Sequence, residues 1–331
     1  MSWLERPGPG LAVAFLLLLA GSGGLVALLL DPAPSPHDPA DEEGVVRVDG
    51  VLREYHLHVP SADDSPDVPM GEGNATALPL VIVLHGGGGD GRLVAEQTGF
   101  SAVADREGFA VAYPNAHVVP GSSNHFWNAG FCCDAALEGP DDVLFLRAVI
   151  DDVATRIDID LERVYLVGFS NGGMMVHWAA ASRPSLFDGI AVVSGAYAAA
   201  PTPGAQEIVP PSPSRGMPTL LVHGLKDGII PADGGPTGRA NSTLLFPPVE
   251  DALAFWARAA GYNGQPERTF AADGDHLWLN HTHRAVPVSA LLLREGLHRW
   301  PVEPDATRLI WRFFETAHAA SDVRRDVAGQ P

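Results

Sequence analysis

The sequence has almost no lysine and little positive charge. Lys226 is its only lysine, and the formal net charge of the 331 residues is −19. Nucleic acids and anionic membrane surfaces would repel so acidic a chain, which argues against both as partners. The hydrophobic share of 46% is typical of a globular protein that carries one apolar segment.

Cysteine is equally scarce. Cys132 and Cys133 are the only two in the chain, so within one molecule each can pair only with the other. Across a trans peptide their Cα atoms lie about 3.8 Å apart, which is shorter than the usual disulfide span of about 4.4–6.8 Å. The two interpretations are therefore a strained, easily reduced bridge and a pair of free, buried thiols.

The one long uncharged stretch lies near the start. Residues 11–30 would span about 30 Å as a helix, enough to cross a bilayer. Arg6 precedes the stretch and Asp31 follows it, an order that directs the rest of the chain outward. We interpret residues 1–30 as a signal peptide or membrane anchor, and residues 31–44 as a disordered linker rich in proline and aspartate. The protein is then secreted or tethered to the outer face of the membrane.

From residue 45 the hydrophobic pattern predicts a single α/β domain to residue 320, followed by a flexible tail at 321–331. Alternating apolar residues around Asp49-Gly50 indicate an N-terminal β-hairpin. Short apolar runs then alternate with helical spacing, which predicts a mostly parallel sheet with helices on both faces. The expected strands are 78–84, 109–113, 164–167, 190–193, 220–222 and 286–293, and the expected helices are 93–106, 142–157, 173–181, 249–260 and 306–317.

The strand at 164–167 leads into Gly168-Phe169-Ser170-Asn171-Gly172, a G-x-S-x-G sequence before a helical pattern. In a nucleophile elbow the serine sits on a sharp strand-to-helix turn, and the flanking glycines allow the close backbone approach that the turn needs. A glycine-rich helix start is the alternative. The context favours Ser170 as a nucleophile.

The strand at 78–84 ends in His85-Gly86-Gly87. Acyl transfer places negative charge on the carbonyl oxygen, and backbone N–H groups must face it. We expect this oxyanion hole to consist of the amides of Asn171 and Gly87, with Gly86 next to them. A flexible glycine loop is the alternative, while a phosphate loop is disfavoured because no Gly-Lys-Ser/Thr follows.

A serine hydroxyl needs a base, and the base needs an acid to orient it. Asp227 follows the strand at 220–222, and His298 follows the strand at 286–293. They stand in the order that the α/β-hydrolase fold requires, nucleophile, acid, histidine. For Asp227 a simple Asp-Gly turn is the alternative, with Asp233 and Asp251 as other candidate acids.

Three further histidines, His276, His281 and His283, precede the last expected strand. With the nearby aspartates they could form a metal site, but an exposed polar loop is the preferred interpretation. We therefore predict no metal and no organic cofactor.

These motifs resemble the polyhydroxybutyrate depolymerase-like esterases, a group that merges with feruloyl esterases of carbohydrate esterase family one. The resemblance covers about residues 45–317 and is carried by Ser170-Asn171-Gly172-Gly173-Met174-Met175, His85-Gly86, Trp127-Asn128, Cys132-Cys133, His223-Gly224-x-x-Asp227, His298-x-Trp300-Pro301 and the final helix from Ala306. It implies an α/β-hydrolase fold and secreted ester hydrolysis. Arg299 departs from the small polar residue that is common there. No separate substrate-binding domain is expected after residue 317, which argues against attack on insoluble polymer.

The sequence thus predicts an exported serine esterase for feruloyl, acetyl or short hydroxyalkanoate esters, acting on small-molecule or polymer substrates. His85, Trp127 and Trp300 are expected to line the substrate pocket. Phe126 is expected to line its acyl part together with Trp127, although aromatic residues at a loop base are more often core. The alternatives are a peptidase of the same fold and a catalytically silent surface binding protein on a hydrolase scaffold.

Overall fold

The computed structural model describes residues 41–60, 77–119, 121–132, 139–240, 242–271, 274–282 and 286–328. All of them belong to one compact unit, Asp38–Pro331. The predicted leader at 1–30 and most of the predicted linker at 31–44 lie outside the described residues. Within the described ranges, no helix is both long enough and apolar enough to cross a membrane.

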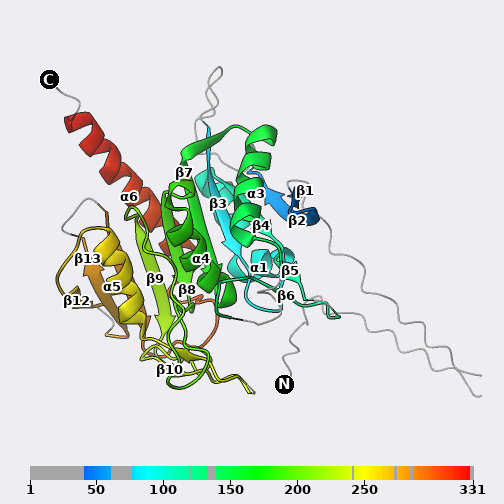
Figure 1. The fold of residues 1–331 in the computed structure, drawn as a ribbon. Helices are drawn as coiled ribbons and strands as arrows, with labels where there is room; N and C mark the ends of the chain where they lie inside the picture. Colours follow the sequence, from blue (N-terminus) through cyan, green and yellow to red (C-terminus); the bar gives the residue numbers. More distant parts are fainter. Residues whose placement is uncertain are drawn as a thin grey trace, which may run out of the picture. The chain divides into compact units, whose positions relative to one another are not determined.

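A ten-stranded sheet runs through the domain in the order β1-β2-β4-β3-β7-β8-β9-β14-β13-β12 (Figure 1). Strands β4, β3, β7, β8, β9 and β14 run parallel to one another, and the strands at both edges are antiparallel. The strands are β1 (Asp41–Val48), β2 (Val51–His58), β3 (Leu78–Leu84), β4 (Ala110–Pro114), β7 (Ile159–Phe169), β8 (Gly189–Val193), β9 (Thr219–Gly224), β12 (Glu267–Phe270), β13 (His276–His281) and β14 (Val288–Leu293).

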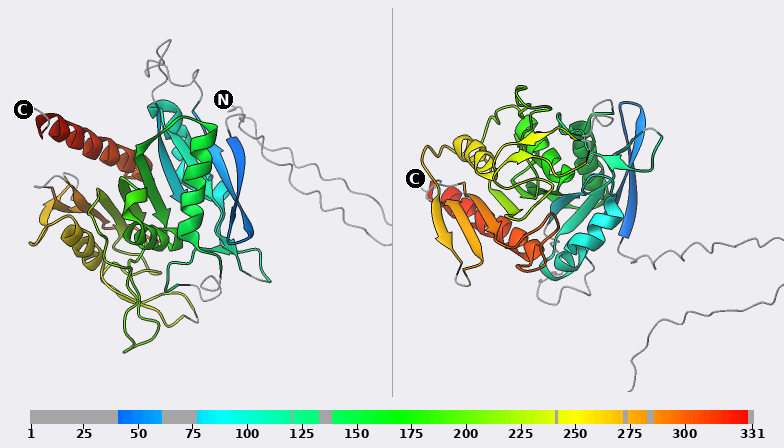
Figure 2. Two further views of the ribbon diagram at one scale, coloured as in Figure 1. Left: turned by 45° about the horizontal axis from the view of Figure 1, so that its top comes forward. Right: turned by 90° about the horizontal axis from the view of Figure 1, so that it is seen from below.

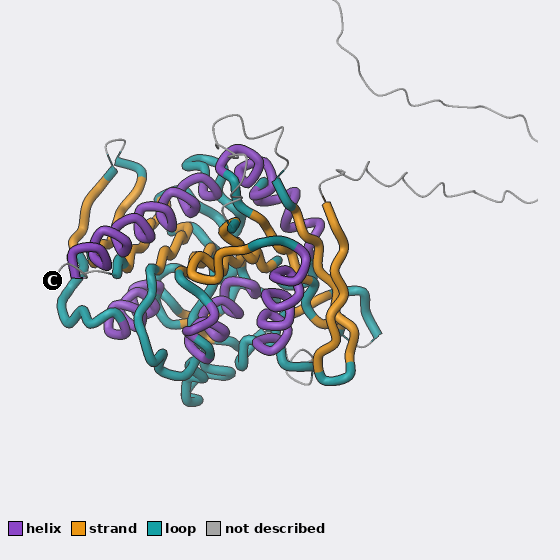
Figure 3. Tube along the Cα trace, turned by 90° about the horizontal axis from the view of Figure 1, so that it is seen from above, coloured by secondary structure: helices purple, strands orange, loops and turns teal. Residues whose placement is uncertain are grey.

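Helices cover both faces of this sheet, as the views in Figures 2 and 3 show. Alternate residues of β3 explain why both faces need cover: Ile82 packs in one core cluster and Val83 in the other. The cluster that contains Ile82 also contains residues of α3 (Asp142–Arg156), α4 (Asn171–Ser182) and α5 (Val249–Ala259). The cluster that contains Val83 also contains residues of α1 (Gly91–Thr98), α2 (Phe100–Glu107) and α6 (Ala306–Ala328). This is the predicted α/β arrangement.

The N-terminal hairpin is also present, because β1 pairs with β2 across a turn in which Asp49 and Gly50 both have positive φ. Its first strand begins at Asp41, so the part of the predicted linker from 41 to 44 is strand. Similarly, α6 continues to Ala328 through the region predicted as a tail. The single helix expected over 93–106 is two helices, since Gly99 adopts φ 65° and caps α1.

The prediction of an exposed loop around His276 and His281 is wrong, because both residues belong to β13. This strand pairs with β14 on one side and β12 on the other. Only Leu279 and His281 of β13 are buried, so the strand lacks the apolar run that revealed the central strands. His283 lies outside the described residues.

The strand order places the candidate site. From β3 the chain proceeds to β4 on one side, and β7 lies on the other, so the connections diverge between β3 and β7. Ligands of open α/β sheets bind at the carboxyl ends of the strands beside such a switch point. Leu84 and Gly168 are register partners there, which brings the predicted oxyanion loop next to the predicted nucleophile.

A buried ion pair fastens the hairpin to the domain. Arg53 of β2 donates to the Asp142 carboxylate at 2.7 Å, and their side chains are only 3% and 1% exposed. The other carboxylate oxygen accepts from the N–H of Asn128, and the guanidinium lies 4.0 Å from the Phe145 ring centroid. Burial raises the pKa of Asp142, while the charge of Arg53 opposes that rise.

We predict that Arg53→Met lowers the free energy of unfolding by about 3–5 kcal/mol, because it leaves the Asp142 carboxylate buried without its counter-charge. The double variant Arg53→Met/Asp142→Asn should lose clearly less, since the neutral amide keeps an acceptor for Asn128. Urea denaturation of the parent and the variants measures this. A loss below about 1 kcal/mol for Arg53→Met, or no recovery in the double variant, would contradict the prediction.

Candidate active site

Ser170 occupies a strained turn between β7 and α4. Its φ of 54° and ψ of −118° are unusual for a residue with a side chain. The turn depends on its neighbours: a Cβ on Gly168 would lie 2.4 Å from the carbonyl oxygen of Gly172, and one on Gly172 would lie 2.5 Å from that of His85. The predicted elbow is therefore present, with a steric reason for both glycines.

Three loops bring Ser170, His298 and Asp227 together at the carboxyl ends of β7, β14 and β9. Nε2 of His298 lies 2.8 Å from Oγ of Ser170, and Nδ1 of His298 lies 2.8 Å from Oδ2 of Asp227. The imidazole thus bridges hydroxyl and carboxylate, the arrangement in which a histidine takes the proton from a serine hydroxyl.

The Asp227 carboxylate is completely buried and tightly held. Its Oδ1 accepts from the N–H groups of Ile229 and Ile230, both at 2.9 Å, and Nε2 of His223 lies 3.4 Å from Oδ2. Desolvation raises the pKa of Asp227, but the hydrogen bonds from His223, His298 and Ile230 outweigh it and hold the pKa well below its ordinary value. The carboxylate is thereby kept charged and oriented toward His298.

The loop after β3 lies against the serine. Gly86, Gly87 and Asn171 line the same cavity as Ser170, and a Cβ on Gly86 or Gly87 would lie 3.5 Å from the Cβ of Ser170 or Asn171, respectively. Asn171 is the first residue of α4, where amides have no acceptor within the helix. The two residues whose amides are predicted to form the oxyanion hole, Gly87 and Asn171, therefore line the cavity beside Ser170.

His85, Trp127 and Trp300 do not line that cavity, and the prediction that they form the substrate pocket is wrong. All three are buried. Nδ1 of His85 donates to the carbonyl of Gly86, its Nε2 accepts from the N–H of Ala116, and Nε1 of Trp127 donates to the carbonyl of His85. His85 and Trp127 thus brace the glycine loop from behind, while Nε1 of Trp300 donates to Thr307 on α6.

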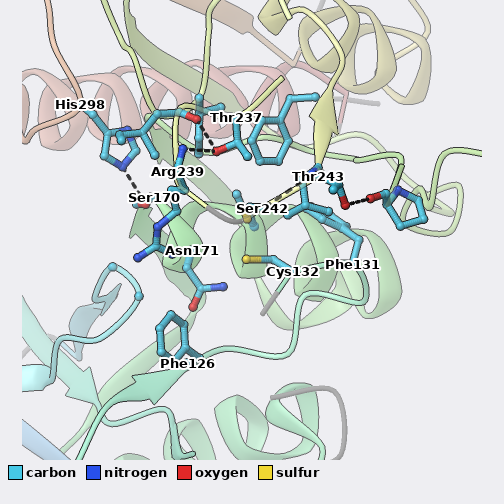
Figure 4. A pocket seen from close by; sticks show the side chains of 18 of the residues that line it. Phe126, Phe131, Cys132, Ser170, Asn171, Thr237, Arg239, Ser242, Thr243 and His298 are labelled. Atoms are coloured by element: carbon cyan, nitrogen blue, oxygen red, sulfur yellow. Dashed lines mark hydrogen bonds between the residues drawn. The ribbon is translucent and has the colours of Figure 1, made fainter. Parts of the chain in front are cut away.

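The cavity in front of Ser170 has a volume of about 930 Å³ (Figure 4). Phe126 and Phe131 contribute to one wall, and Phe126 agrees with the prediction for that residue. Further lining residues are Ile229 and Ile230 and members of the segment between β10 (Gly235–Pro236) and β11 (Leu245–Phe246), of which Ile230 and Phe246 share a hydrophobic cluster with Phe131. The sequence showed only a long loop here, and its polar residues Thr237, Arg239, Ser242 and Thr243 gave no periodic signal.

Cys132 also lines the cavity and is disulfide-bonded. Cys133 lies outside the described residues, so the pairing of the two stays a prediction. The other candidate acids are not used: neither Asp233 nor Asp251 lies among the residues that contact His298 in the described part of the chain.

Comparison with known proteins agrees with this geometry. Residues 68–205 match the family described as Esterase PHB depolymerase. The provisionally named esterase NocK of Nocardia uniformis subsp. tsuyamanensis is 31% identical over 88% of this chain and 89% of its own length. The chain belongs to the Esterase PHB depolymerase family. It is a serine hydrolase that acts on ester bonds.

Further similarities of this esterase are more distant. Feruloyl esterase B of Piromyces equi is 28% identical over 64% of this chain, an alignment that spans 38% of that protein. The solved acetyl xylan esterase from Aspergillus awamori is 13% identical, with a TM-score of 0.54, over 82% of this chain and 99% of its own. The likeness to that structure concerns the fold alone.

The His85 brace predicts a pH dependence of stability. Burial lowers the pKa of His85 to about 4, against about 6.5 in an unfolded chain. The unfolded state therefore binds this proton first, so the contribution to stability is complete above pH ~6.5 and is lost as the pH falls toward 4. Between pH 7 and 5 the loss from this residue should be about 2 kcal/mol.

We predict that His85→Gln, whose amide oxygen can still accept from Ala116, loses about 2 kcal/mol less stability than the parent on this acidification. Denaturant titrations at pH 7 and pH 5 measure it. His318→Gln, on α6 and remote from the loop, controls for the removal of a histidine. Equal losses in the parent and in His85→Gln would show that His85 is not buried as a neutral ring.

Proposed function

We propose that the protein is an exported serine esterase that works through a Ser170–His298–Asp227 triad and an acyl-enzyme. The observation that carries the proposal is the pair of 2.8 Å contacts that join the serine hydroxyl, the imidazole and the buried carboxylate. The strained turn at Ser170 and the adjoining cavity support it. Neither rival interpretation, peptidase or silent binding protein, has a specific observation in its favour.

The mechanism follows from these positions. Ser170 Oγ attacks the ester carbonyl while His298 Nε2 takes its proton, and Asp227 orients the ring and stabilises the positive charge that forms. The amides of Asn171 and Gly87 donate to the oxygen that becomes negative. His298 then returns the proton to the leaving alcohol, which departs as the acyl-enzyme forms.

In the second half His298 takes a proton from water, and the resulting nucleophile attacks the acyl carbon. Collapse of this intermediate breaks the bond to Ser170 Oγ, and His298 returns the proton to that oxygen, so acid and free enzyme result. Every proton taken up in one half-reaction is returned within it. These steps draw only on groups of the chain and on water.

The substrate class rests on the relatives. Feruloyl and acetyl esters are proposed because proteins named feruloyl esterase and acetylxylan esterase are similar in sequence. Short hydroxyalkanoate esters are proposed from the match to the Esterase PHB depolymerase family, and the cavity walls combine apolar and polar side chains. Export is proposed from the uncharged stretch at 11–30. N-terminal sequencing of protein recovered outside the cell would test export, and recovery only inside the cell would contradict it.

We predict a burst of 4-nitrophenol, stoichiometric with enzyme, when the parent is mixed with excess 4-nitrophenyl acetate. An acyl-enzyme that forms faster than it hydrolyses produces such a burst. Ser170→Ala should show none and should lose about 10⁴-fold or more in kcat. Ser101→Ala, on α2 and away from the cavity, should behave as the parent. Turnover by Ser170→Ala at the rate of the parent would reject the proposal.

A further inference from the structure

The segment between β10 and β11, which the sequence did not identify as part of the site, contributes the positive charge of Arg239 to the cavity wall. We name residues 235–240 and 242–246 the cavity strap, which runs between β10 and β11. The hydroxyl of Thr237 donates to the carbonyl of Ile229 at 2.9 Å and accepts from the N–H of Arg239 at 3.2 Å. The strap is thereby tied to the loop that carries Asp227, two residues before Ile229, and the backbone of Arg239 is fixed beside the site.

Arg239 is the only lysine or arginine among the described residues that line the cavity, and no aspartate or glutamate lines it with them. Figure 4 shows the Arg239 side chain extending from the strap toward the region where Ser170 and Asn171 lie. Within the described ranges its guanidinium forms neither an ion pair nor a hydrogen bond.

Arg239 differs in this from several other arginines of the chain. The formal net charge is −19, so carboxylates are plentiful, and other arginines use them: Arg92, Arg163 and Arg268 each contact a glutamate. A guanidinium offers several donors in a planar fork that matches a carboxylate. The N–H donors of the Arg239 guanidinium therefore remain available to a ligand in the cavity.

The negative charge around the cavity makes the position of Arg239 significant. An anionic substrate meets repulsion from the acidic protein and from the buried Asp227 carboxylate behind His298. A cation that contacts such a molecule directly offsets this repulsion. Arg239 is placed to make that contact.

We propose that Arg239 binds a carboxylate of the substrate, so that the preferred substrates are esters whose acyl or alcohol part carries a free carboxylate. This inference rests on the proposed esterase function and narrows its substrate class. The carboxylate can belong to a hemiester of a dicarboxylic acid or to the acid end of a hydroxy-acid ester. The chemistry recognised is the same in both, and separate substrates distinguish them.

The test compares kcat/KM for matched pairs of esters. For the acyl side the pair is mono-4-nitrophenyl adipate and its methyl ester, and for the alcohol side it is 4-acetoxybenzoate and its methyl ester. Each pair differs in one negative charge. The enzymes are the parent, Arg239→Gln, Arg239→Lys and Arg147→Gln, of which the last removes one positive charge from an exposed side chain on α3.

In at least one pair, the ratio of kcat/KM for the charged ester to that for the neutral ester should fall about tenfold in Arg239→Gln, mainly through KM. Arg239→Lys should lie between parent and Arg239→Gln, because it keeps the charge and loses the fork. Arg147→Gln should leave the ratio unchanged. Arg147→Gln should also hydrolyse the neutral esters at the rate of the parent.

A ratio that Arg239→Gln leaves unchanged in both pairs would overturn the inference while leaving the esterase function intact. An equal fall in Arg239→Gln and Arg147→Gln would also overturn it, because the effect would then be one of net charge. Failure of the parent to hydrolyse even the neutral esters would reject the proposed function itself, and the inference with it.

Discussion

The hydrogen bond between Nδ1 of His298 and the buried carboxylate of Asp227 is the interaction on which the site depends. It joins loops from two neighbouring strands, β14 and β9. Because Oδ1 of Asp227 is held by two backbone amides of its own loop, Oδ2 is left to face the imidazole. The ring is then oriented with Nε2 toward Ser170. Removing the carboxylate would leave the histidine free to rotate, and the serine without an oriented base.

The same geometry explains why the strands position the residues at Ser170 while long connections form the walls of the cavity. Parallel strands place their carboxyl ends at one edge, so the framework delivers Ser170, His298 and the glycine loop to fixed positions. The cavity walls come instead from long connections, one that contains Phe126 and Phe131 and one that forms the cavity strap. Variation in these walls can change the ester that is accepted without disturbing the strands.

The sequence predicted the framework and the hydrogen-bonded set of Ser170, His298 and Asp227 because their signals are local. Two-sided burial makes the central strands continuous apolar runs, and the turn at Ser170 demands glycine at fixed positions. The half-exposed strand β13 has no such run and was missed. His85, Trp127 and Trp300 were misplaced because a motif places a residue in a loop but does not say which side of the loop it faces. Arg239 was missed because its significance lies in what surrounds it in space.

The most direct test of the central claim is to treat the protein with a fluorophosphonate, which phosphonylates only a serine that an oriented base has activated. Peptide mass spectrometry then locates the adduct. The account predicts one adduct per chain, on Ser170, formed rapidly by the parent and far more slowly by Asp227→Asn. An adduct on another residue, or equal labelling rates in the parent and Asp227→Asn, would contradict the claim that Asp227 and His298 activate Ser170.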